Sequence, residues 1–402
     1  MKTTSTPLIV RSMVDSIPFV DIHTHLFPTS FKTKALFGID ELLNYHYLTS
    51  EFLVKTKTQP ERYFGAPHRE RAQQIWTHLF VKNTPLSEAS SGVVNVISKL
   101  GLDPNEKSLD ALRAAWPSKE PGALEDLVFR LAQIQSVVMT NNPCDPEEWS
   151  LFAHQDWDRS RFQSSLRLDD LFVGSKHANP YSTMKEEGIR SFLGDAIRES
   201  NPKYLALSTD ASAFCKTVLP SPAWLALLKS AKEHGLPIAL MWGVQRGTNA
   251  AFLSGGDSIG DNSLEPLIEL LRCHPDQTFM VTVLDLALQH QITALARVFP
   301  NLILFGCWWY LNNPTIHKNL QSTRMEMLGL NFVPQHSDAR ILEQLIYKWD
   351  HFRNDFSSCL AGRYDRLLES GLTLDEDRMR RDIDHFASGL KGHCQIDGEP
   401  HP

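Results

Sequence analysis

Short apolar runs alternate along the chain with longer segments of helical periodicity. Each run has the length and the β-branched or aromatic content of a buried strand, and the segments between runs are long enough for crossover helices. The alternation predicts a parallel sheet covered by helices, and eight runs favour a closed (β/α)8 TIM barrel of the α/β class over an open sheet. The predicted strands are residues 19–25, 135–140, 162–168, 204–209, 237–242, 278–284, 302–309 and 331–336.

The connection between the first two predicted strands is far longer than the others. It covers residues 26–134, about 110 residues, and a segment of that length needs secondary structure of its own. Apolar residues recur in it with helical spacing over 39–54, 70–80, 92–100, 109–115 and 124–131. We therefore predict that residues 1–25 and 135–402 form a barrel with C-terminal helices. Residues 26–134 are predicted to form a helical cap subdomain, inserted between strands 1 and 2, over the barrel mouth.

Composition and charge narrow the class of protein. The chain has 402 residues, 42% of them hydrophobic, which is sufficient for a large barrel carrying insertions, and a soluble enzyme is the default class. A net charge of −7 and a pI near 6.1 provide no global basic field, which argues against nucleic acid as the main partner. An anionic substrate must therefore be bound by local arginines.

The cysteines and the N-terminus favour the cytoplasm. The six cysteines are scattered without a CxxC pair, which is typical of reduced thiols rather than of a disulfide framework or a zinc knuckle. The N-terminal apolar stretch is too short for a signal peptide, and no apolar run approaches membrane-spanning length. We expect a cytoplasmic protein with a small-molecule substrate and no membrane partner, and a homo-oligomer remains open.

Two histidines at the end of the first predicted strand are the strongest chemical signal. Residues i and i+2 of a strand point to the same face, so His23 and His25 can reach one divalent cation. They also lie at the strand end where barrel enzymes place their chemistry. A chance pair on a half-buried strand is the alternative. Asp338, after the eighth strand, can complete the metal site, although Ser337 or Asp338 can equally cap a helix.

Four further clusters lie in the cap or at predicted strand ends, and each has a structural alternative. His46 and Tyr47 belong to an aromatic stretch that also suits a packed helix face. Arg167 leaves the third strand at the barrel mouth, where it can bind an anion or form an ordinary ion pair. Arg246 follows the fifth strand in what can be a polar turn. Trp308 follows the seventh strand and can serve packing alone.

Together these clusters resemble one family, the uronate isomerases of the amidohydrolase superfamily, which are metal-dependent (β/α)8 barrels. The resemblance spans most of the chain and depends on the order and spacing of the motifs. The matching pieces are His23 with His25, Tyr45-His46-Tyr47, Thr140-Asn141-Asn142-Pro143, Arg167 with Asp169, Gly243 with Arg246 and Asn249, Trp308-Trp309, and Asp338-Ala339-Arg340.

The resemblance implies an aldose–ketose isomerase acting on a hexuronate, an intramolecular oxidoreductase. His23, His25 and Asp338 would hold one divalent metal, which in the family is usually zinc. Asp338 would serve as the base, and His46 or Tyr47 would shuttle a proton. The residues implied to contact the sugar acid, besides His46, are Arg167, Arg340, Trp308 and Arg246.

The sequence departs from the family pattern at strand five. Met241 stands where the family commonly has a histidine, and a thioether suits a borderline cation poorly, so we expect a mononuclear site without Met241 as a ligand. Two other functions stay open. One is a mononuclear hydrolase or decarboxylase of the same superfamily, and the other is a non-catalytic protein that binds a sugar acid.

Overall fold

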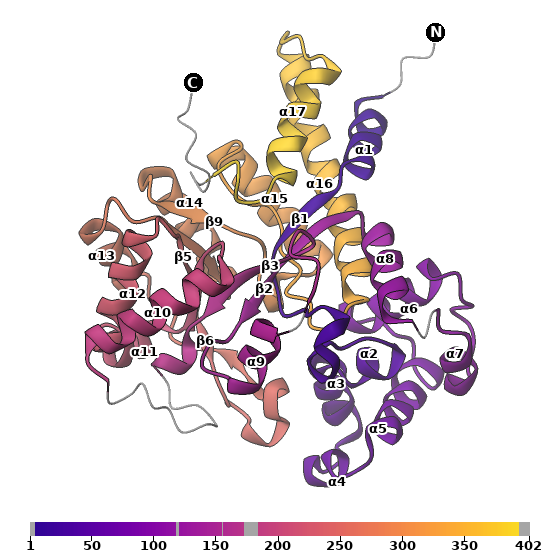
Figure 1. Cartoon of the computed structure of the whole chain (residues 1–402). Helices are drawn as coiled ribbons and strands as arrows, with labels where there is room; N and C mark the ends of the chain where they lie inside the picture. Colours follow the sequence, from indigo (N-terminus) through magenta and orange to yellow (C-terminus); the bar gives the residue numbers. More distant parts are fainter. Residues whose placement is uncertain (1–4, 118–119, 155, 173–183, 394–402) are drawn as a thin grey trace.

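Seven parallel strands form one curled sheet at the centre of the computed structural model, in the order β1-β2-β3-β4-β5-β8-β9 (Figure 1). The structure describes residues 5–117, 120–154, 156–172 and 184–393. A two-stranded antiparallel ribbon, β6 with β7, follows β5. The strands are β1 (Phe19–Thr24), β2 (Ile134–Asn141), β3 (Phe162–Arg167), β4 (Leu205–Thr209), β5 (Ile238–Trp242), β6 (Val244–Gln245), β7 (Ser258–Ile259), β8 (Phe279–Val283) and β9 (Leu302–Leu304).

The predicted barrel-type α/β fold is confirmed, but its last two strands are shorter than predicted. β9 ends at Leu304, because Gly306 adopts a positive φ of 57° and turns the chain. The predicted strand 331–336 is not a regular strand. Val333 pairs with Phe305 in a single parallel bridge, and Pro334 follows, which lacks the N–H that a continuing ladder needs.

The segment after this bridge nevertheless occupies the place of an eighth strand. Val333 exchanges backbone hydrogen bonds with Leu304 and Gly306 on one side. Further along, the amide of Asp338 donates to the carbonyl of His23, and the amide of His25 donates to the carbonyl of Ala339. The segment thus connects β9 to β1 and brings Asp338 beside the end of β1.

Helices cover the outside of the sheet. The sheet strands are buried almost throughout, as in β5, where all five residues are buried, which is the burial expected of a parallel sheet with both faces covered. The helices that follow the strands are α9 (Pro146–His154), α10 (Glu186–Ser200), α11 (Ala211–Ala213), α12 (Pro222–Glu233), α13 (Glu265–Cys273), α14 (Gln289–Val298) and α15 (Pro314–Leu328).

The described residues between β1 and β2 form seven α-helices, in the segment predicted to be helical. Figure 1 shows most of them gathered at one side of the molecule, away from α10–α14. The helix expected over 39–54 is broken in two, because Tyr45 takes an extended conformation (φ −59°, ψ 141°) before His46 starts the next helix. These helices are α2 (Ile39–Asn44), α3 (His46–Thr56), α4 (Pro60–Phe64), α5 (His68–Ile75), α6 (Glu88–Lys99), α7 (Leu109–Ala115) and α8 (Pro121–Ala132).

One long helix connects the two groups. Helix α16 (Gln344–Glu369) packs against α6 and α8 along one part and against α15 and α1 (Thr6–Ser16) along another, and α17 (Glu376–Ala387) follows it (Figure 1). Short 3-10 or π turns complete the secondary structure at Thr29–Lys34, Trp76–Val81, Asp169–Leu171, Phe214–Val218, Ala250–Gly256, Leu286–Leu288 and Trp309–Leu311.

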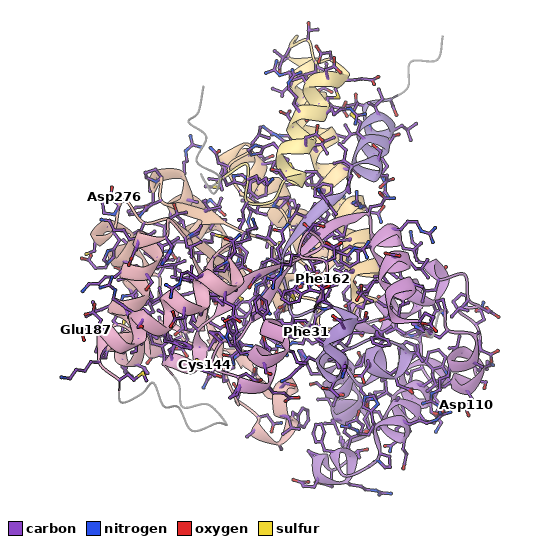
Figure 2. The ribbon with its side chains drawn as sticks, viewed as in Figure 1. Phe31, Asp110, Cys144, Phe162, Glu187 and Asp276 are labelled. Carbon is purple, nitrogen blue, oxygen red and sulfur yellow. The ribbon has the colours of Figure 1, made fainter. Side chains whose placement is uncertain are left out.

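The apolar core is continuous from the barrel into these inserted helices. Phe31, 0% exposed, and Phe162, 2% exposed, belong to the same buried cluster, and Figure 2 shows both in the interior, whereas Asp110, Glu187 and Asp276 lie at the periphery. A second buried cluster fills the inside of the barrel with apolar side chains from several strands. The inserted helices are therefore packed onto the barrel rather than tethered to it.

The described residues contain no single helix that is long and apolar enough to cross a membrane. One bent pair, Ala211–Val218 with Pro222–Glu233, meets that criterion by length and composition only. The five cysteines in the described part of the chain are free thiols.

A buried carboxylate attaches the start of the inserted segment to the chain after Asp338. Glu343 is fully buried, and its Oε1 accepts hydrogen bonds from the amide of Gly38 (2.7 Å) and from Trp116 Nε1 (3.0 Å). A bridge between Leu36 and Ile341 lies beside it. Burial raises the pKa of Glu343 to about 6, against the opposing effect of the Trp116 hydrogen bond.

We predict that Glu343→Gln makes stability less dependent on pH. Because the folded-state pKa is raised, the folded protein binds more protons than the unfolded chain, so Glu343 lowers the free energy of unfolding as pH rises from 4.5 to about 6. The loss amounts to about 2 kcal/mol. Glutamine keeps an acceptor for both N–H groups and does not titrate. Urea unfolding should therefore show a smaller fall in the free energy of unfolding between pH 4.5 and pH 7.5 for the variant than for the wild type.

The exposed Glu187→Gln variant controls for the loss of one negative charge. The prediction would be contradicted if the free energy of unfolding changed between the two pH values by the same amount in Glu343→Gln and in the wild type.

Candidate metal and substrate site

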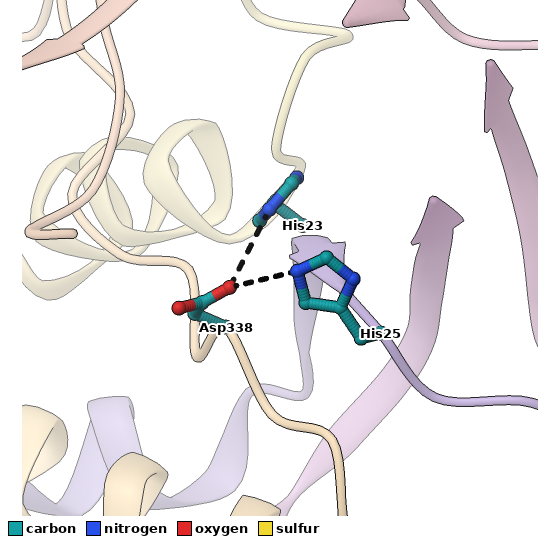
Figure 3. Close-up of side chains that lie close together, drawn as sticks. All are labelled: His23, His25 and Asp338. Carbon is teal, nitrogen blue, oxygen red and sulfur yellow. Dashed lines mark ion pairs between the residues drawn. The ribbon is translucent and has the colours of Figure 1, made fainter. Parts of the chain in front are cut away.

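His23 at the end of β1, His25 directly after this strand and Asp338 of the segment that follows α15 converge at the barrel mouth (Figure 3). Asp338 Oδ1 lies 3.6 Å from His23 Nε2 and 3.2 Å from His25 Nε2. Ligand atoms around a tetrahedral zinc, at bonds of about 2.1 Å, are roughly 3.4 Å apart. The three side chains therefore have the spacing of ligands to one cation.

A local irregularity in β1 helps to place these histidines. Asp21 pairs with Val137 and Thr24 with Met139, so two residues of β1 lie opposite one residue of β2, as in a β-bulge. The bulge lets Ile22 pack inside the barrel while its neighbour His23 still faces His25 and Asp338. Strict strand alternation, which the sequence argument used, does not describe this stretch.

Asp338 adopts a left-handed backbone conformation, φ 53°, which non-glycine residues rarely take. Neighbouring groups hold it there. Its amide donates to the His23 carbonyl (3.1 Å), and the amide of Ser337 donates to the buried carboxylate of Asp21 (3.0 Å). Trp349 Nε1 donates to the other oxygen of Asp21 (2.9 Å). The strained position of the carboxylate is thus fixed by β1 and α16 together.

Lys348 of α16 also stabilises the backbone next to Asp338. Its side chain is 2% exposed, and Nζ donates to the carbonyl of Ser337 at 2.5 Å. Burial lowers the pKa of Lys348, and the nearby Asp338 and Asp21 partly oppose that effect. A buried lysine beside the candidate metal ligands contributes positive charge without occupying a ligand position.

The atoms at the centre of the group suit a cation. His23 Nε2 and Asp338 Oδ1 are buried and have no hydrogen-bond partner among the described residues. Buried polar atoms without a partner are costly, and lone pairs of two imidazoles facing a carboxylate repel one another unless a positive ion lies between them. The residues present therefore fit a divalent metal.

Most of the predicted site residues line one small cavity of about 30 Å³ above this group. His23 lies beneath it and is fully buried, and Met241 lies in its wall. Tyr47 lines a neighbouring cavity instead. The predicted residues that share the first cavity are His25, His46, Arg167, Arg246, Trp308, Asp338 and Arg340.

The three arginines of this cavity differ in their partners. Arg167 pairs with Asp169 at 3.0 Å, and Arg246 pairs with Asp257 at 2.6 Å. Among the described residues, no side chain forms an ion pair or a hydrogen bond with the Arg340 guanidinium. Arg340 therefore has the guanidinium most available to an anionic ligand.

Burial determines the protonation of the ionisable groups around the cavity. Burial and, next, the charge of Arg340 lower the pKa of His46 to about 3. The same two causes, in the same order, lower the pKa of His25. Burial raises the pKa of Tyr47 well above its usual range. At neutral pH, His46 is thus a neutral imidazole that can accept a proton, and Tyr47 is a phenol that can donate one.

His46 and Trp309 form a wall shared by two cavities. Their rings lie 5.7 Å apart, edge to face, and both line the small cavity and a neighbouring one of about 270 Å³. The larger cavity also contacts Tyr47, Glu51 and Lys348. The inserted helix α3 therefore provides part of the wall of the site.

Sequence reasoning missed the supporting residues. Lys348 stands inside the apolar run Leu345-Ile346-Tyr347-Lys348-Trp349, and a charged residue in such a run is a signal that could have identified it. The role of Asp21 in fixing Ser337 had no comparable signal, because it depends on a contact 316 residues away in the sequence.

His336 packs beneath the candidate ligands with unusually little space. Its ring lies 5.3 Å from that of His23, and both ring nitrogens are buried without a partner among the described residues. A Cβ added at Gly306 would lie 1.9 Å from His336 Nδ1, which explains why a glycine occupies this turn.

No protein-family model matches the chain, and no curated protein matches it. Solved structures do. A uronate isomerase from Bacillus halodurans C-125 is 36% identical, with a TM-score of 0.88 and 96% of each chain covered. A glucuronate isomerase from Caulobacter crescentus is 18% identical, with a TM-score of 0.75, covering 100% of this chain and 96% of that one. A uronate isomerase from Thermotoga maritima is 14% identical, with a TM-score of 0.71 and 96% of each chain covered.

We predict that Gly306→Ala is much more destabilising than Gly235→Ala. Both glycines have similar positive φ values, 57° and 63°, so both substitutions incur the left-handed backbone penalty of about 1–2 kcal/mol. Only Gly306 faces a clash, since nothing lies within 4 Å of the Cβ position at Gly235. Overpacking should cost about 1–3 kcal/mol more. Urea unfolding measures the stability of both variants. Equal losses of stability would show that the His336 side chain moves aside without a cost and would contradict the prediction.

Proposed function

The chain belongs to the uronate isomerase family of the amidohydrolase superfamily, and we propose that it interconverts a hexuronate aldose and its 2-ketose. The predicted family and enzyme class are confirmed by the solved uronate isomerase from Bacillus halodurans. The candidate reactions are D-glucuronate to D-fructuronate and D-galacturonate to D-tagaturonate. One observation supports this reaction above all: His25 and Asp338 of the candidate metal group line one cavity with Arg340, whose guanidinium has no ion-pair partner in the part of the chain that the structure describes.

The reaction moves a proton between C2 and C1 of the sugar through an enediol. We assign the base to Asp338, whose carboxylate faces the cavity. His46, neutral at pH 7, accepts a proton from a sugar hydroxyl, and the phenol of Tyr47 returns one from the adjacent cavity. His46 contacts Tyr47 edge to face, with ring centroids 4.5 Å apart, so the two groups can act on neighbouring oxygens.

His23, His25 and Asp338 would hold the metal, which we propose to be a single zinc ion. When bound there, it supplies positive charge that polarises the carbonyl and the adjacent hydroxyl of the sugar. Three protein ligands leave a position open, as in catalytic zinc sites.

The far carboxylate of the substrate is assigned to Arg340, which can offer two parallel N–H donors. Arg167 and Arg246 already carry ion-pair partners, so their net attraction for a second carboxylate is smaller. They are assigned to the sugar hydroxyls, with Trp308 packing against the ring. This assignment refines the sequence prediction, which treated Arg167 and Arg340 alike.

The helical segment 26–134 is proposed to act as a cap subdomain on the barrel formed by 1–25 and 135–402. His46 on α3 supports this division, because it lines the cavity together with Asp338. The cytoplasmic location, the lack of nucleic-acid and membrane partners, and the homo-oligomer stay predictions.

Exchange with solvent tests the reaction directly. In D2O, the protein should incorporate deuterium at C2 of D-glucuronate or D-galacturonate, because the enediol is reprotonated from solvent-derived groups. Proton NMR follows the loss of the C2 signal and the appearance of the ketose. Asp338→Asn is the matched variant, since it keeps the size of the side chain and removes the base, and we expect loss of exchange.

The two alternative functions predict other spectra. A hydrolase or decarboxylase leaves these sugars unchanged, and a binding protein broadens the lines without exchange. Either result with metal-loaded protein, across several hexuronates, would contradict the proposed isomerisation.

Arginine substitutions test which guanidinium binds the substrate carboxylate. Arg340→Met should lower kcat/KM for the hexuronate roughly ten- to hundredfold. This corresponds to a loss of about 1.5–3 kcal/mol of transition-state stabilisation, the range for a hydrogen bond to a charged group. Arg246→Met should cost less, because Asp257 already neutralises that guanidinium. Exposed Arg272→Met on α13 controls for the change in net charge. Equal losses for Arg246→Met and Arg340→Met would refute the assignment.

A further inference from the structure

In each histidine of the candidate metal group, the ring nitrogen that faces away from Asp338, Nδ1, lies within hydrogen-bond distance of a buried hydroxyl. His23 Nδ1 lies 3.0 Å from the phenol oxygen of Tyr204, and His25 Nδ1 lies 2.8 Å from Thr140 Oγ1. Tyr204 directly precedes β4, and its side chain belongs to the inner barrel cluster that contains Ile22. Thr140 is on β2. Neither hydroxyl reaches the proposed substrate cavity, since neither residue lines it.

Both hydroxyls also contact a main-chain oxygen of β1. The phenol of Tyr204 donates to the carbonyl of Ile22 at 2.8 Å, and Thr140 Oγ1 donates to the carbonyl of Thr24 at 3.0 Å. In each case, this carbonyl belongs to the residue directly before the histidine. The same arrangement therefore occurs twice, built from different residue types on different strands.

The direction of these hydrogen bonds follows from proton counting. A hydroxyl has one hydrogen, and a carbonyl oxygen can only accept. In the hydrogen bonds to the Ile22 and Thr24 carbonyls, each hydroxyl therefore spends its only hydrogen on the carbonyl. The Ser165 hydroxyl also interacts with Tyr204, but it donates to the Met139 carbonyl at 2.7 Å. A phenol that donated to Ser165 instead would still have no hydrogen for His23. With its hydrogen on the carbonyl, each hydroxyl oxygen can only accept from its histidine, and this arrangement places the hydrogen on Nδ1.

We propose that Tyr204 and Thr140 are positioning residues that hold His23 and His25 in the Nδ1–H tautomer, with both Nε2 lone pairs directed at Asp338 Oδ1. The competing tautomer, with hydrogen on Nε2, would hydrogen-bond to Asp338 and fill the space of the cation. In that tautomer, Nδ1 and the hydroxyl oxygen either face each other as two buried acceptors, or the hydroxyl turns its hydrogen to Nδ1 and gives up its hydrogen bond to the β1 carbonyl. The inference rests on the proposed metal site only in its consequence for metal affinity.

The consequence is a site prepared for a metal before the metal binds. The cation meets two bare imidazole nitrogens and a carboxylate, so no tautomer must change and no histidine–aspartate hydrogen bond must break. Partners on the far nitrogen of metal-binding histidines typically contribute tenfold to hundredfold to metal affinity. We expect losses of that size from removing either hydroxyl.

Two measurements on the full-length protein test the proposal. The first is ¹⁵N NMR of the histidine side chains in metal-free protein, which distinguishes a protonated from a bare ring nitrogen, with assignments from His23→Gln and His25→Gln. The second is Zn²⁺ affinity by competition with a chromophoric chelator. The variants are Tyr204→Phe and Thr140→Val, which lose a hydroxyl at nearly constant volume, and Thr140→Ser, which keeps one.

Thr282→Val is the matched control. Thr282 is 1% exposed on β8, and its hydroxyl has no hydrogen-bond partner among the described residues, so the variant removes a buried barrel hydroxyl that is not hydrogen-bonded to a described histidine. We expect Thr282→Val and Thr140→Ser to bind Zn²⁺ like wild type. Tyr204→Phe and Thr140→Val should bind about tenfold to hundredfold more weakly, and the tautomer of the affected histidine should become mixed.

Several outcomes would overturn the proposal. Hydrogen on Nε2 of His23 and His25 in the metal-free wild type would do so, as would wild-type Zn²⁺ affinity in both hydroxyl-deleted variants. If Tyr204→Phe does not fold, the Thr140 pair and the wild-type spectrum still decide. A wild-type protein that binds no divalent cation would refute the proposed metal site, whereas the NMR measurement would still judge the tautomers.

Discussion

The candidate site depends on how the segment around Asp338 is joined to β1. Two backbone hydrogen bonds, one from Asp338 to His23 and one from His25 to Ala339, fix the carboxylate between the two imidazoles. They hold Asp338 in a left-handed conformation that costs about 1–3 kcal/mol in isolation. The same bonds fill the place of the missing eighth strand, so closure of the barrel and assembly of the metal group are one structural event.

Two buried ionisable groups next to the Asp338 segment, Asp21 and Lys348, have specific hydrogen-bond partners. Asp21 accepts from Ser337 and Trp349, and Lys348 donates to the Ser337 carbonyl. Such groups add little net stability, since burial of charge is costly, but losing one partner leaves the other uncompensated. Their arrangement fixes one geometry for Asp338, which a purely apolar joint would not specify.

The inserted helices also form part of the wall of the candidate site. The break at Tyr45 starts α3 at His46, and that histidine shares a cavity with Asp338 and Arg340. Burial in this wall, with the charge of Arg340, keeps His46 neutral at physiological pH. Packing of the inserted segment onto the barrel therefore determines the protonation state of a group proposed to move a proton.

The alternation of strands and helices, the helical insertion and the pairing of His23 with His25 could be predicted from the sequence alone, because they depend on periodicity and spacing over a few residues. The motifs also indicated the family, which the comparison with solved structures confirmed. Three features depend on contacts between distant residues and became visible only in the folded chain: the bridge that replaces strand eight, the support of Asp338 by Asp21, and the absence of an ion-pair partner for Arg340 among the described residues. Sequence spacing carries no information on such contacts, since they form only when the sheet curls and its ends meet.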